Sequence, residues 1–251
     1  MNIIEVSNLK KDYKFSVKEK GFFKRKSKVV RAVNNISFNV KEGETIAFIG
    51  PNGAGKSTTI KMLTGILYPT SGDIKICGYT PIKDRDKLSY NIGTVFGQRS
   101  QLLPNLPLTD SMEMFGLMYD MSDADIKKRI RELSKLFDLD EFINQPVRKL
   151  SLGQRMRAEI AVSLMHSPKI IFLDEPTIGL DVVSKKKLRD LLLKINKYEG
   201  VTIFLTSHDT EDIQSICDRC VIINHGRIII DTSTHDLMSS YAKNKNIIIT
   251  P

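Results

Sequence analysis

The sequence predicts an α/β protein with a largely parallel sheet and a helical subdomain inserted into it. Short apolar segments alternate with stretches of helical periodicity, which is the pattern of a sheet whose parallel strands are joined by helices. Between Ile92 and Ile170 the pattern is mostly helical, with strand-like segments on either side. The 251 residues suffice for one large domain or two closely packed ones.

Strand-like segments dominate the first part of the chain. Segments rich in β-branched residues lie at 3–6, 29–33 and 36–40, and a turn is expected at 41–44. The apolar run 45–49 is followed by glycine, as expected of a strand that is buried on both faces. The chain therefore begins with strands and reaches a buried strand just before its first helix.

Helical periodicity begins directly after that strand. The apolar spacing is helical over 57–67, and Pro69 and the Ser-Gly pair at 71–72 are expected to end this helix. Ser122 is expected to cap a second helix, with Asp125 favoured in its first turn. One face of that helix carries the apolar residues Ile126, Ile130, Leu133 and Phe137. Short apolar strands are then expected within 169–175, 201–208 and 220–224.

Composition favours anionic partners in a reducing compartment. The net charge is +9, the hydrophobic content is 41%, and three cysteines form no paired framework, which indicates a reduced cytosolic chain. We find no secretory signal and no apolar run long enough to cross a bilayer. Residues 18–28 carry six basic side chains against Glu19 alone. This segment fits either a solvated loop or a contact with acidic lipid or a membrane protein, and no nucleic-acid motif accompanies it.

One glycine-rich segment has the spacing of a nucleotide phosphate loop, G-x-x-x-x-G-K-[ST], between a predicted strand and a predicted helix. Its backbone amides are expected to curl around the phosphates of a nucleotide. Lys56 neutralises phosphate charge in this interpretation, and Ser57 supplies an oxygen for magnesium. The segment consists of Gly50, Pro51, Asn52, Gly53, Ala54, Gly55, Lys56, Ser57 and Thr58.

An apolar strand that ends in two carboxylates is the expected partner of this loop. The run 170–173 is followed by Asp174 and Glu175. The strand would deliver both side chains beside the magnesium of the phosphate loop. We expect Asp174 to hold the metal and Glu175 to polarise the attacking water.

A second helix start has the features of an anion site. Ser151 and Gly153 stand at the predicted beginning of a helix, with Arg155 and Arg157 just inside it. The first amides of a helix lack carbonyl partners, so they favour an anion. The phosphate loop already accounts for one nucleotide, so this second site requires another explanation.

Taken together, these segments resemble the ATP-binding subunits of ABC transporters over nearly the whole chain. The residues 150–154, L-S-L-G-Q, stand where that family has L-S-G-G-Q, with Leu152 replacing a glycine. The resemblance implies a P-loop NTPase (RecA-like) core with a mostly parallel sheet, an N-terminal antiparallel β subdomain and an inserted α-helical subdomain. It implies a single ABC ATPase domain over 1–251, with the core at 1–97 and 165–251 and the helical signature subdomain at 98–164.

In this family two such domains meet head to tail, and each signature helix covers the ATP of the other. The resemblance therefore implies that Ser151, Gly153 and Gln154 contact the ATP held by a neighbour. It also implies ATP and Mg²⁺ as cofactors. Other matching positions are Gln98, for magnesium and water; Asp181, in the D-loop at the dimer interface; His208, for the γ-phosphate; and Tyr13, for stacking on adenine. Tyr13 as an ordinary strand aromatic and His208 as a structural histidine are the alternatives.

The resemblance further implies two protein partners. One is a second nucleotide-binding domain, either identical or a close paralogue, and the other is an integral membrane permease at the cytoplasmic face of the cell membrane. Export is favoured because three features look most like ATPases paired with multidrug-type export permeases: the segment F-G-Q-R-S-Q-L, the basic insertion after Tyr13 and the segment D-E-P-T-I-G-L-D-V-V. The apolar, proline-interrupted segment 102–107 and the methionines at 112, 114 and 118 are a candidate groove for a permease helix, or ordinary core.

Two other classes of ATPase are the alternatives to a transport subunit. A soluble ABC ATPase acting in translation or in nucleic-acid transactions is favoured only by the basic segment 18–28, so no nucleic acid is expected as a partner. A phosphate-loop kinase or GTPase would leave the segment 151–154, Glu175 and His208 unexplained together.

Overall fold

The computed structural model describes residues 1–18, 25–97 and 100–241. Most of the basic segment 18–28 and the residue Gln98 lie outside this part of the chain. The strands are β1 (Asn2–Lys18), β2 (Arg25–Lys41), β3 (Thr45–Ile49), β4 (Ser71–Ile76), β5 (Ile92–Phe96), β6 (Ile170–Asp174), β7 (Thr202–Thr206), β8 (Arg219–Asn224) and β9 (Arg227–Ser233). The helices are α1 (Lys56–Leu63), α2 (Arg85–Ser89), α3 (Leu108–Met118), α4 (Asp123–Phe137), α5 (Leu152–Ser163), α6 (Val182–Glu199), α7 (Thr210–Ile216) and α8 (Thr234–Tyr241).

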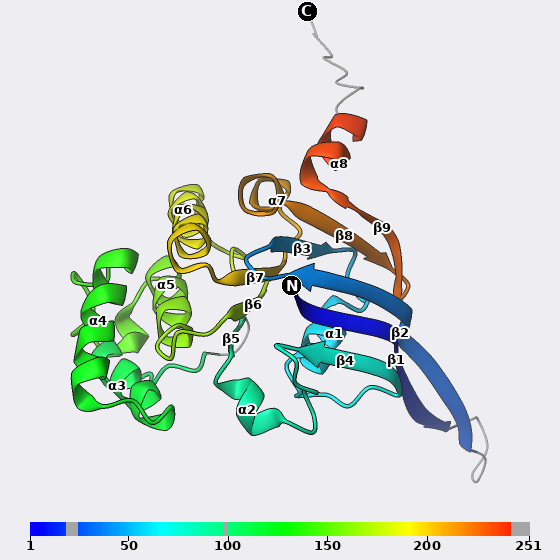
Figure 1. Ribbon diagram of the computed structural model, residues 1–251, viewed down its shortest axis with the longest axis horizontal. Coiled ribbons are helices and arrows are strands. Elements are labelled where there is room, and N and C mark those ends of the chain that lie inside the picture. The colour runs from blue at the N-terminus through cyan, green and yellow to red at the C-terminus, as the bar shows by residue number, and fades with distance from the viewer. Residues whose placement is uncertain (19–24, 98–99, 242–251) are drawn as a thin grey trace, which may run out of the picture.

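The strands form two sheets. The larger has six strands in the order β5-β6-β7-β3-β8-β9, and only its β8–β9 pairing is antiparallel. The smaller is an antiparallel sheet in the order β2-β1-β4. Figure 1 shows α3, α4 and α5 gathered beyond β5, at the end of the molecule opposite β1 and β2. The predicted α/β class with a mostly parallel sheet is confirmed.

Alternating side chains of the central strands divide the core into two layers. Ala47, Ile171 and Leu205 join a buried cluster that includes the apolar faces of α5 and α6. Phe48 and Phe204 point the other way, into a cluster shared with α1 and the antiparallel sheet, with their ring centroids 5.5 Å apart. Burying such a side chain stabilises the fold by about 1.5–3 kcal/mol. Because both faces are covered, the strands read as continuous apolar runs.

Two predicted elements have different limits in the structure. The segments 29–33 and 36–40 belong to one long strand, β2, which pairs with β1 through several register shifts. The first helix ends at Leu63 instead of Leu67. There the amide of Ile66 donates to the carbonyl of Lys61 and the amide of Gly65 to that of Met62, which is a Schellman closure. This local motif ends the helix before Pro69 is reached.

The helical lobe begins as expected from its capping residue. The Oγ atom of Ser122 accepts a hydrogen bond from the amide of Asp125, at 3.2 Å, and α4 follows. The four apolar residues predicted to share one face of α4 are all buried. Among the described helices, none is both long and apolar enough to cross a membrane.

A histidine is packed at the base of this lobe. The ring of His166 stacks on Tyr119 with centroids 3.8 Å apart, and its Nε2 atom donates to the carbonyl of Ile92 at 3.0 Å. Burial lowers the pKa of His166 to about 4. The folded protein therefore holds this imidazole in its neutral form.

Acid is expected to destabilise the fold through His166. The unfolded chain binds a proton near pH 6.5, whereas folded His166 binds it only near pH 4, so stability is lost as the pH falls through this window. Titration of this one group changes the free energy of unfolding by at most about 1.4 kcal/mol per pH unit. His166→Gln keeps a donor for Ile92 but cannot titrate. Urea unfolding at pH 7, 6 and 5 measures how the free energy of unfolding of wild type and of His166→Gln depends on pH. An equal pH dependence in the two proteins would contradict the role given to His166.

Candidate functional site

The carboxyl ends of three neighbouring parallel strands meet at one edge of the large sheet. Asp174, the last residue of β6, pairs in register with Thr206, the last residue of β7. The strand β3 lies next to β7 and runs into the glycine-rich loop. Ligands of open α/β sheets bind at this edge. The topology therefore brings the loop, the two carboxylates and His208 together, although they are far apart in sequence.

The phosphate loop joins β3 to α1 as predicted. Gly55 stands at the N-cap of α1 with φ of 111°, and a Cβ atom there would lie 2.4 Å from the carbonyl oxygen of Ala32 in β2. Only glycine fits this position. The outer residues 51–53 are exposed, whereas Ala54 and Gly55 are buried. The first amides of α1 have no helical partners, so the loop can bind an anion.

Lys56 supplies the positive charge of this site. Its side chain is nearly buried, and its ammonium donates to the carbonyl of Gly50 at 2.7 Å and lies 3.1 Å from the Nε2 atom of His208. Burial lowers the pKa of Lys56, and the charges of Glu175 and Asp174 oppose this shift. The ammonium therefore sits between the carboxylates and the loop, where a phosphate would neutralise it.

Ser57 and Asp174 place two oxygen ligands side by side. The Oγ atom of Ser57 donates to Oδ1 of Asp174 at 3.3 Å, and the hydroxyl of Thr206 donates to the same oxygen at 2.6 Å. A hydroxyl and a carboxylate are the hard ligands that Mg²⁺ accepts together with phosphate oxygens. The donor set therefore fits a magnesium–nucleotide complex. Gln98, the third expected metal contact, lies outside the described residues.

Glu175 and His208 face one another across the same edge. Nε2 of His208 lies 2.8 Å from Oε1 of Glu175. Glu175 has a φ of 56°, which is unusual for a residue with a side chain, and its amide donates to the hydroxyl of Thr206 at 3.1 Å. Strained backbone of this kind costs about 1–3 kcal/mol and is typical of functional sites. The structure thus joins Lys56, Asp174, Glu175 and His208 in one cluster.

The second helix start is also formed as predicted. Ser151 caps α5: its Oγ atom accepts from the amide of Gln154, and the side chain of Gln154 accepts from the amide of Ser151. A Cβ atom on Gly153 would lie 2.5 Å from the Oγ atom of Ser184, so glycine lets α5 approach the start of α6. Leu152, in place of the expected glycine, is half-exposed beside Gly179.

Asp181 holds the start of α6 next to these residues. Its carboxylate accepts from the amide and the hydroxyl of Ser184, at 2.9 and 2.6 Å, and the bond with the hydroxyl is the main cause that lowers its pKa. Four aliphatic side chains surround this point and remain exposed: Leu152 by 39%, Ile178 by 56%, Val182 by 79% and Val183 by 66%. We call these four residues the aliphatic patch. Apolar groups that gather on a surface mark interaction sites.

Tyr13 lies on the hairpin whose other strand contacts the phosphate loop. It pairs with Val30, two residues from Ala32. The ammonium of Lys11 lies 5.4 Å from the centre of its ring, and Phe15 stacks beside it at 6.3 Å. The ring is partly exposed. The geometry therefore leaves Tyr13 available for stacking, and its role in binding adenine stays a prediction.

Sequence patterns did not reveal two polar residues near the site. Thr206 fixes both Asp174 and the backbone of Glu175, as described above. Glu159, which is nearly buried in α5, accepts hydrogen bonds from the hydroxyl of Ser100 and the amide of Gln101. Burial raises the pKa of Glu159. The signal in the sequence that could have revealed Glu159 is a glutamate on an otherwise apolar helix face. Through its two hydrogen bonds Glu159 connects α5 to the segment that follows Gln98.

Comparison with known proteins decides the family. A family profile described as ABC transporter matches residues 33–178, which is more than half of the chain. The chain belongs to the ABC transporter family. This ABC ATPase is 35% identical to the ABC transporter ATP-binding protein NatA of Bacillus subtilis, over 87% of this chain and 88% of NatA. It is also 35% identical to the Nod factor export ATP-binding protein I of Ralstonia nicotianae, over 82% of this chain and 64% of that protein.

A solved structure agrees with this result. The ABC ATPase superposes on the ATP-binding cassette MJ0796 with a TM-score of 0.78, 29% identity, and coverage of 92% of this chain and 98% of that one. That structure is described as a dimer in a post-hydrolysis state, bound to ADP and Pi. The P-loop NTPase fold, the binding of ATP and its hydrolysis are thereby confirmed for this chain. The alternative role in translation or nucleic-acid transactions is not supported.

Proposed function

We propose that this ABC ATPase works as a head-to-tail dimer that drives an export permease. The observation that carries this proposal is the aliphatic patch beside Ser151 and Asp181, because a surface of this kind is costly to leave in water. The second copy is identical or a close paralogue. In such a dimer the start of α5 from one copy covers the phosphate loop of the other.

The first half of each composite site belongs to the phosphate-loop copy. Its backbone and Lys56 bind the phosphates, and Ser57 and Asp174 hold Mg²⁺ together with Gln98. The metal supplies charge neutralisation for the leaving phosphate. Glu175 orients the attacking water, and His208 contacts the γ-phosphate. Tyr13 stacks on the adenine. The convergence of these side chains at one sheet edge supports the assignment.

The second half comes from the partner. Oγ of Ser151 accepts from the amide of Gln154, so its own proton stays available for a phosphate oxygen. The amide of Gly153 and the positive end of α5 add to this attraction. Gln154 and Asp181 complete the contact. Hydrolysis removes the shared γ-phosphate and weakens the dimer, which makes the cycle a ligand-controlled switch. The dimeric state of MJ0796 supports this arrangement by analogy.

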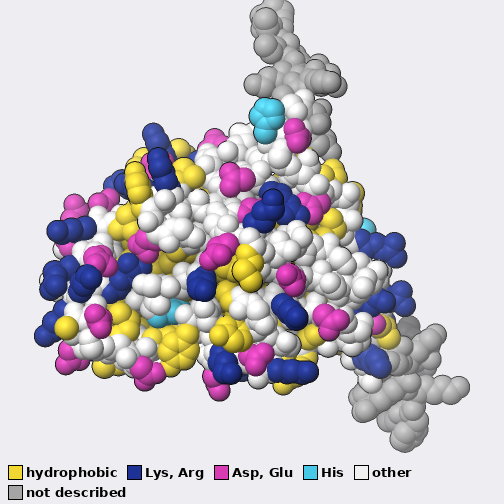
Figure 2. Space-filling view, viewed as in Figure 1, with side chains coloured by type: hydrophobic (Ala, Val, Ile, Leu, Met, Phe, Trp, Pro, Cys, Tyr) yellow, Lys and Arg dark blue, Asp and Glu magenta, His cyan; other side chains and the backbone are white. Residues whose placement is uncertain are grey.

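The helical lobe is the proposed site of permease contact. We propose one ABC ATPase domain over 1–251, whose core at 1–97 and 165–251 carries the helical subdomain at 98–164. On that subdomain Leu106 is exposed by 43%, Leu117 by 60% and Met118 by 65%, whereas Met112 is buried in the core. Figure 2 shows hydrophobic side chains gathered on the surface between α3 and α2. The permease would hold the protein at the cytoplasmic face of the membrane.

Export is the proposed direction of transport. The relative from Ralstonia nicotianae is named for the export of Nod factor. The segments around 96–102 and 174–183 also resemble ATPases of multidrug-type exporters. The transported compound would be bound by the permease and not by this chain.

Permease contact is testable with a charge placed on the helical lobe. Leu106→Asp is expected to lower the recovery of a multi-span membrane protein with the tagged chain by about 10-fold or more, as for a central interface residue. The matched control is Ile229→Asp on β9, where Ile229 is exposed by 57%. Mass spectrometry of complexes purified from detergent-solubilised membranes of the native cells measures this. Equal recovery with Leu106→Asp and wild type would refute the assigned surface, and enrichment of RNA in place of a membrane protein would refute the function.

A further inference from the structure

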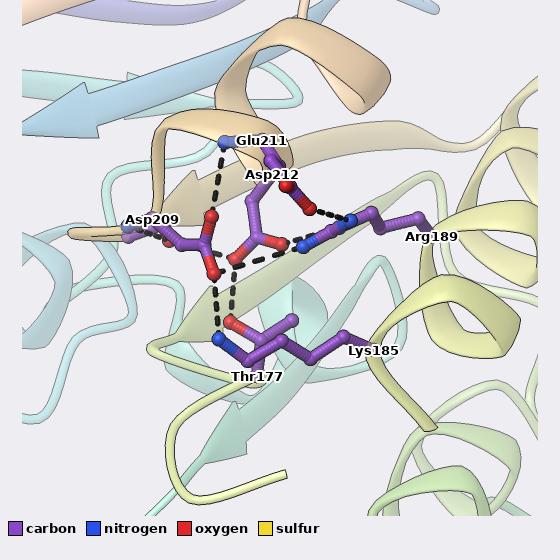
Figure 3. Close-up of polar contacts among 7 residues, drawn as sticks. Thr177, Lys185, Arg189, Asp209, Glu211 and Asp212 are labelled. Carbon is purple, nitrogen blue, oxygen red and sulfur yellow. Dashed lines mark hydrogen bonds and ion pairs between the residues drawn. The ribbon is translucent and has the colours of Figure 1, made fainter. Parts of the chain in front are cut away.

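A buried carboxylate lies behind the candidate catalytic pair, outside the residues considered so far. Asp212, in α7, has no exposed surface. It accepts hydrogen bonds from the hydroxyl of Thr177 at 2.5 Å, the hydroxyl of Ser207 at 2.8 Å and the Nε atom of Arg189 at 2.7 Å. Figure 3 shows Arg189 reaching it from α6, with Thr177 on another side. One carboxylate thus joins three separate parts of the chain.

Two of these donors stand beside the catalytic candidates. Thr177 follows Glu175 by two residues, and Ser207 directly precedes His208. Glu175 and His208 themselves lie 2.8 Å apart. Asp212 therefore holds the chain close to each of these two residues through its bonds with Thr177 and Ser207.

Arg189 and Lys185 extend this contact along α6. The guanidinium of Arg189 also donates to Glu211 at 2.8 Å and lies 3.6 Å from Asp209, and the ammonium of Lys185 donates to Asp209 at 2.6 Å. The bond from Lys185 is the main cause that lowers the pKa of Asp209. Asp209 directly follows His208, so the histidine is held from both sides. We call Thr177, Lys185, Arg189, Ser207, Asp209, Glu211 and Asp212 the histidine brace.

The same helix begins at the proposed dimer interface. Asp181 caps α6, and Ser184 in its first turn touches Gly153 of the signature segment. Lys185 directly follows Ser184, Arg189 lies about one turn further on, and both belong to the histidine brace. A helix is a rigid element, so a shift of its start is expected to move these side chains as well. In the described part of the chain, no contact recorded for Asp212 involves the phosphate loop.

We propose that Asp212 is a positioning residue for hydrolysis. It fixes the position of His208 relative to Glu175 and couples the positions of both residues to that of α6. The proposal rests on the proposed roles of Glu175 and His208. It predicts that loss of the Asp212 charge slows hydrolysis without weakening nucleotide binding, because the carboxylate acts on geometry and does not touch the ligand. The Asp212 carboxylate transmits the state of the interface to the catalytic edge.

The test compares Asp212→Asn with a matched aspartate elsewhere. Asp231→Asn is the control, because Asp231 forms a two-bond pair with Arg219, both at 2.6 Å, on the far strands of the sheet. In Asp212→Asn, kcat for Mg-ATP is expected to fall about 100-fold, as for a small misplacement of reacting groups. Its Kd for ATP is expected to stay within about threefold of wild type. Asp212→Glu, which restores the charge, is expected to recover part of kcat.

A spectroscopic readout separates positioning from mere loss of stability. The imidazole resonance of His208, assigned by its disappearance in His208→Ala, is expected to shift in Asp212→Asn and not in Asp231→Asn. If Asp212→Asn does not fold, Thr177→Val removes one hydrogen bond and is expected to shift the same resonance. An unmoved His208 resonance, or wild-type kcat, overturns the proposal. If Glu175→Gln and His208→Ala themselves hydrolyse ATP at the wild-type rate, the proposed site has failed instead.

Discussion

Lys56→Ala is expected to weaken ATP binding by at least about 100-fold, the effect of losing a desolvated charged contact. The lysine is nearly buried and lies between the loop carbonyls and the two carboxylates. Alanine leaves the negative charges of Asp174 and Glu175 without their nearest cation, and they would repel the phosphates. Isothermal titration with ATP and Mg²⁺ measures the change.

A second lysine on the same helix provides the control for this experiment. Lys61 is exposed in the last turn of α1. Lys61→Ala is expected to bind ATP like the wild type, since its ammonium is in water. If Lys56→Ala kept an affinity within about threefold of wild type, the loop would not be the main phosphate site.

Glu175→Gln is expected to reduce ATP hydrolysis by about 10²–10⁴-fold, the usual contribution of a general base. Glutamine has the same shape, and the hydrogen bonds that fix residue 175 to Thr206 come from its backbone amide. The change therefore removes a charge and leaves the surrounding structure in place. Single-turnover hydrolysis with pre-bound ATP measures the chemical step.

The affinity for ATP separates this effect from a loss of binding. Glu175→Gln should bind ATP at least as well as wild type, because one negative charge next to the phosphates is removed. Glu132→Gln is a suitable control, because Glu132 is half-exposed on α4 and, among the described residues, its ion pair is with Arg129. Retention of more than about a tenth of the wild-type rate in Glu175→Gln would show that another group activates the water.

The sequence was sufficient for those features that depend on local spacing. The phosphate loop, the strand ending in Asp174 and Glu175, and the cap at Ser151 each lie within a few neighbouring residues, so motif and periodicity identify them. The limits of β2 and α1 were missed because they depend on strand pairing and on a helix closure at Gly65. Sequence periodicity does not encode either of these.

The histidine brace could not be predicted from the sequence for a related reason. Thr177 and Asp212 are 35 residues apart, and only the pairing of β6 with β7 brings their loops together. A buried aspartate in the amphipathic helix α7 resembles an ordinary first-turn acid in the sequence. Its partners become evident only when burial and hydrogen bonds are known. The exposure of Val182 and Val183 likewise cannot be read from an apolar pattern, which predicts burial for both.

The central claim is that one ATP is enclosed by the phosphate loop of one copy and the start of α5 of another. Sedimentation of Glu175→Gln with ATP and Mg²⁺ tests it most directly, because this variant should hold the nucleotide without cleaving it. We expect a species of twice the monomer mass, lost when Ser151→Arg adds bulk and charge at the start of α5. A protein that stays monomeric at all concentrations, while wild type hydrolyses ATP at a specific rate independent of its own concentration, would contradict the account.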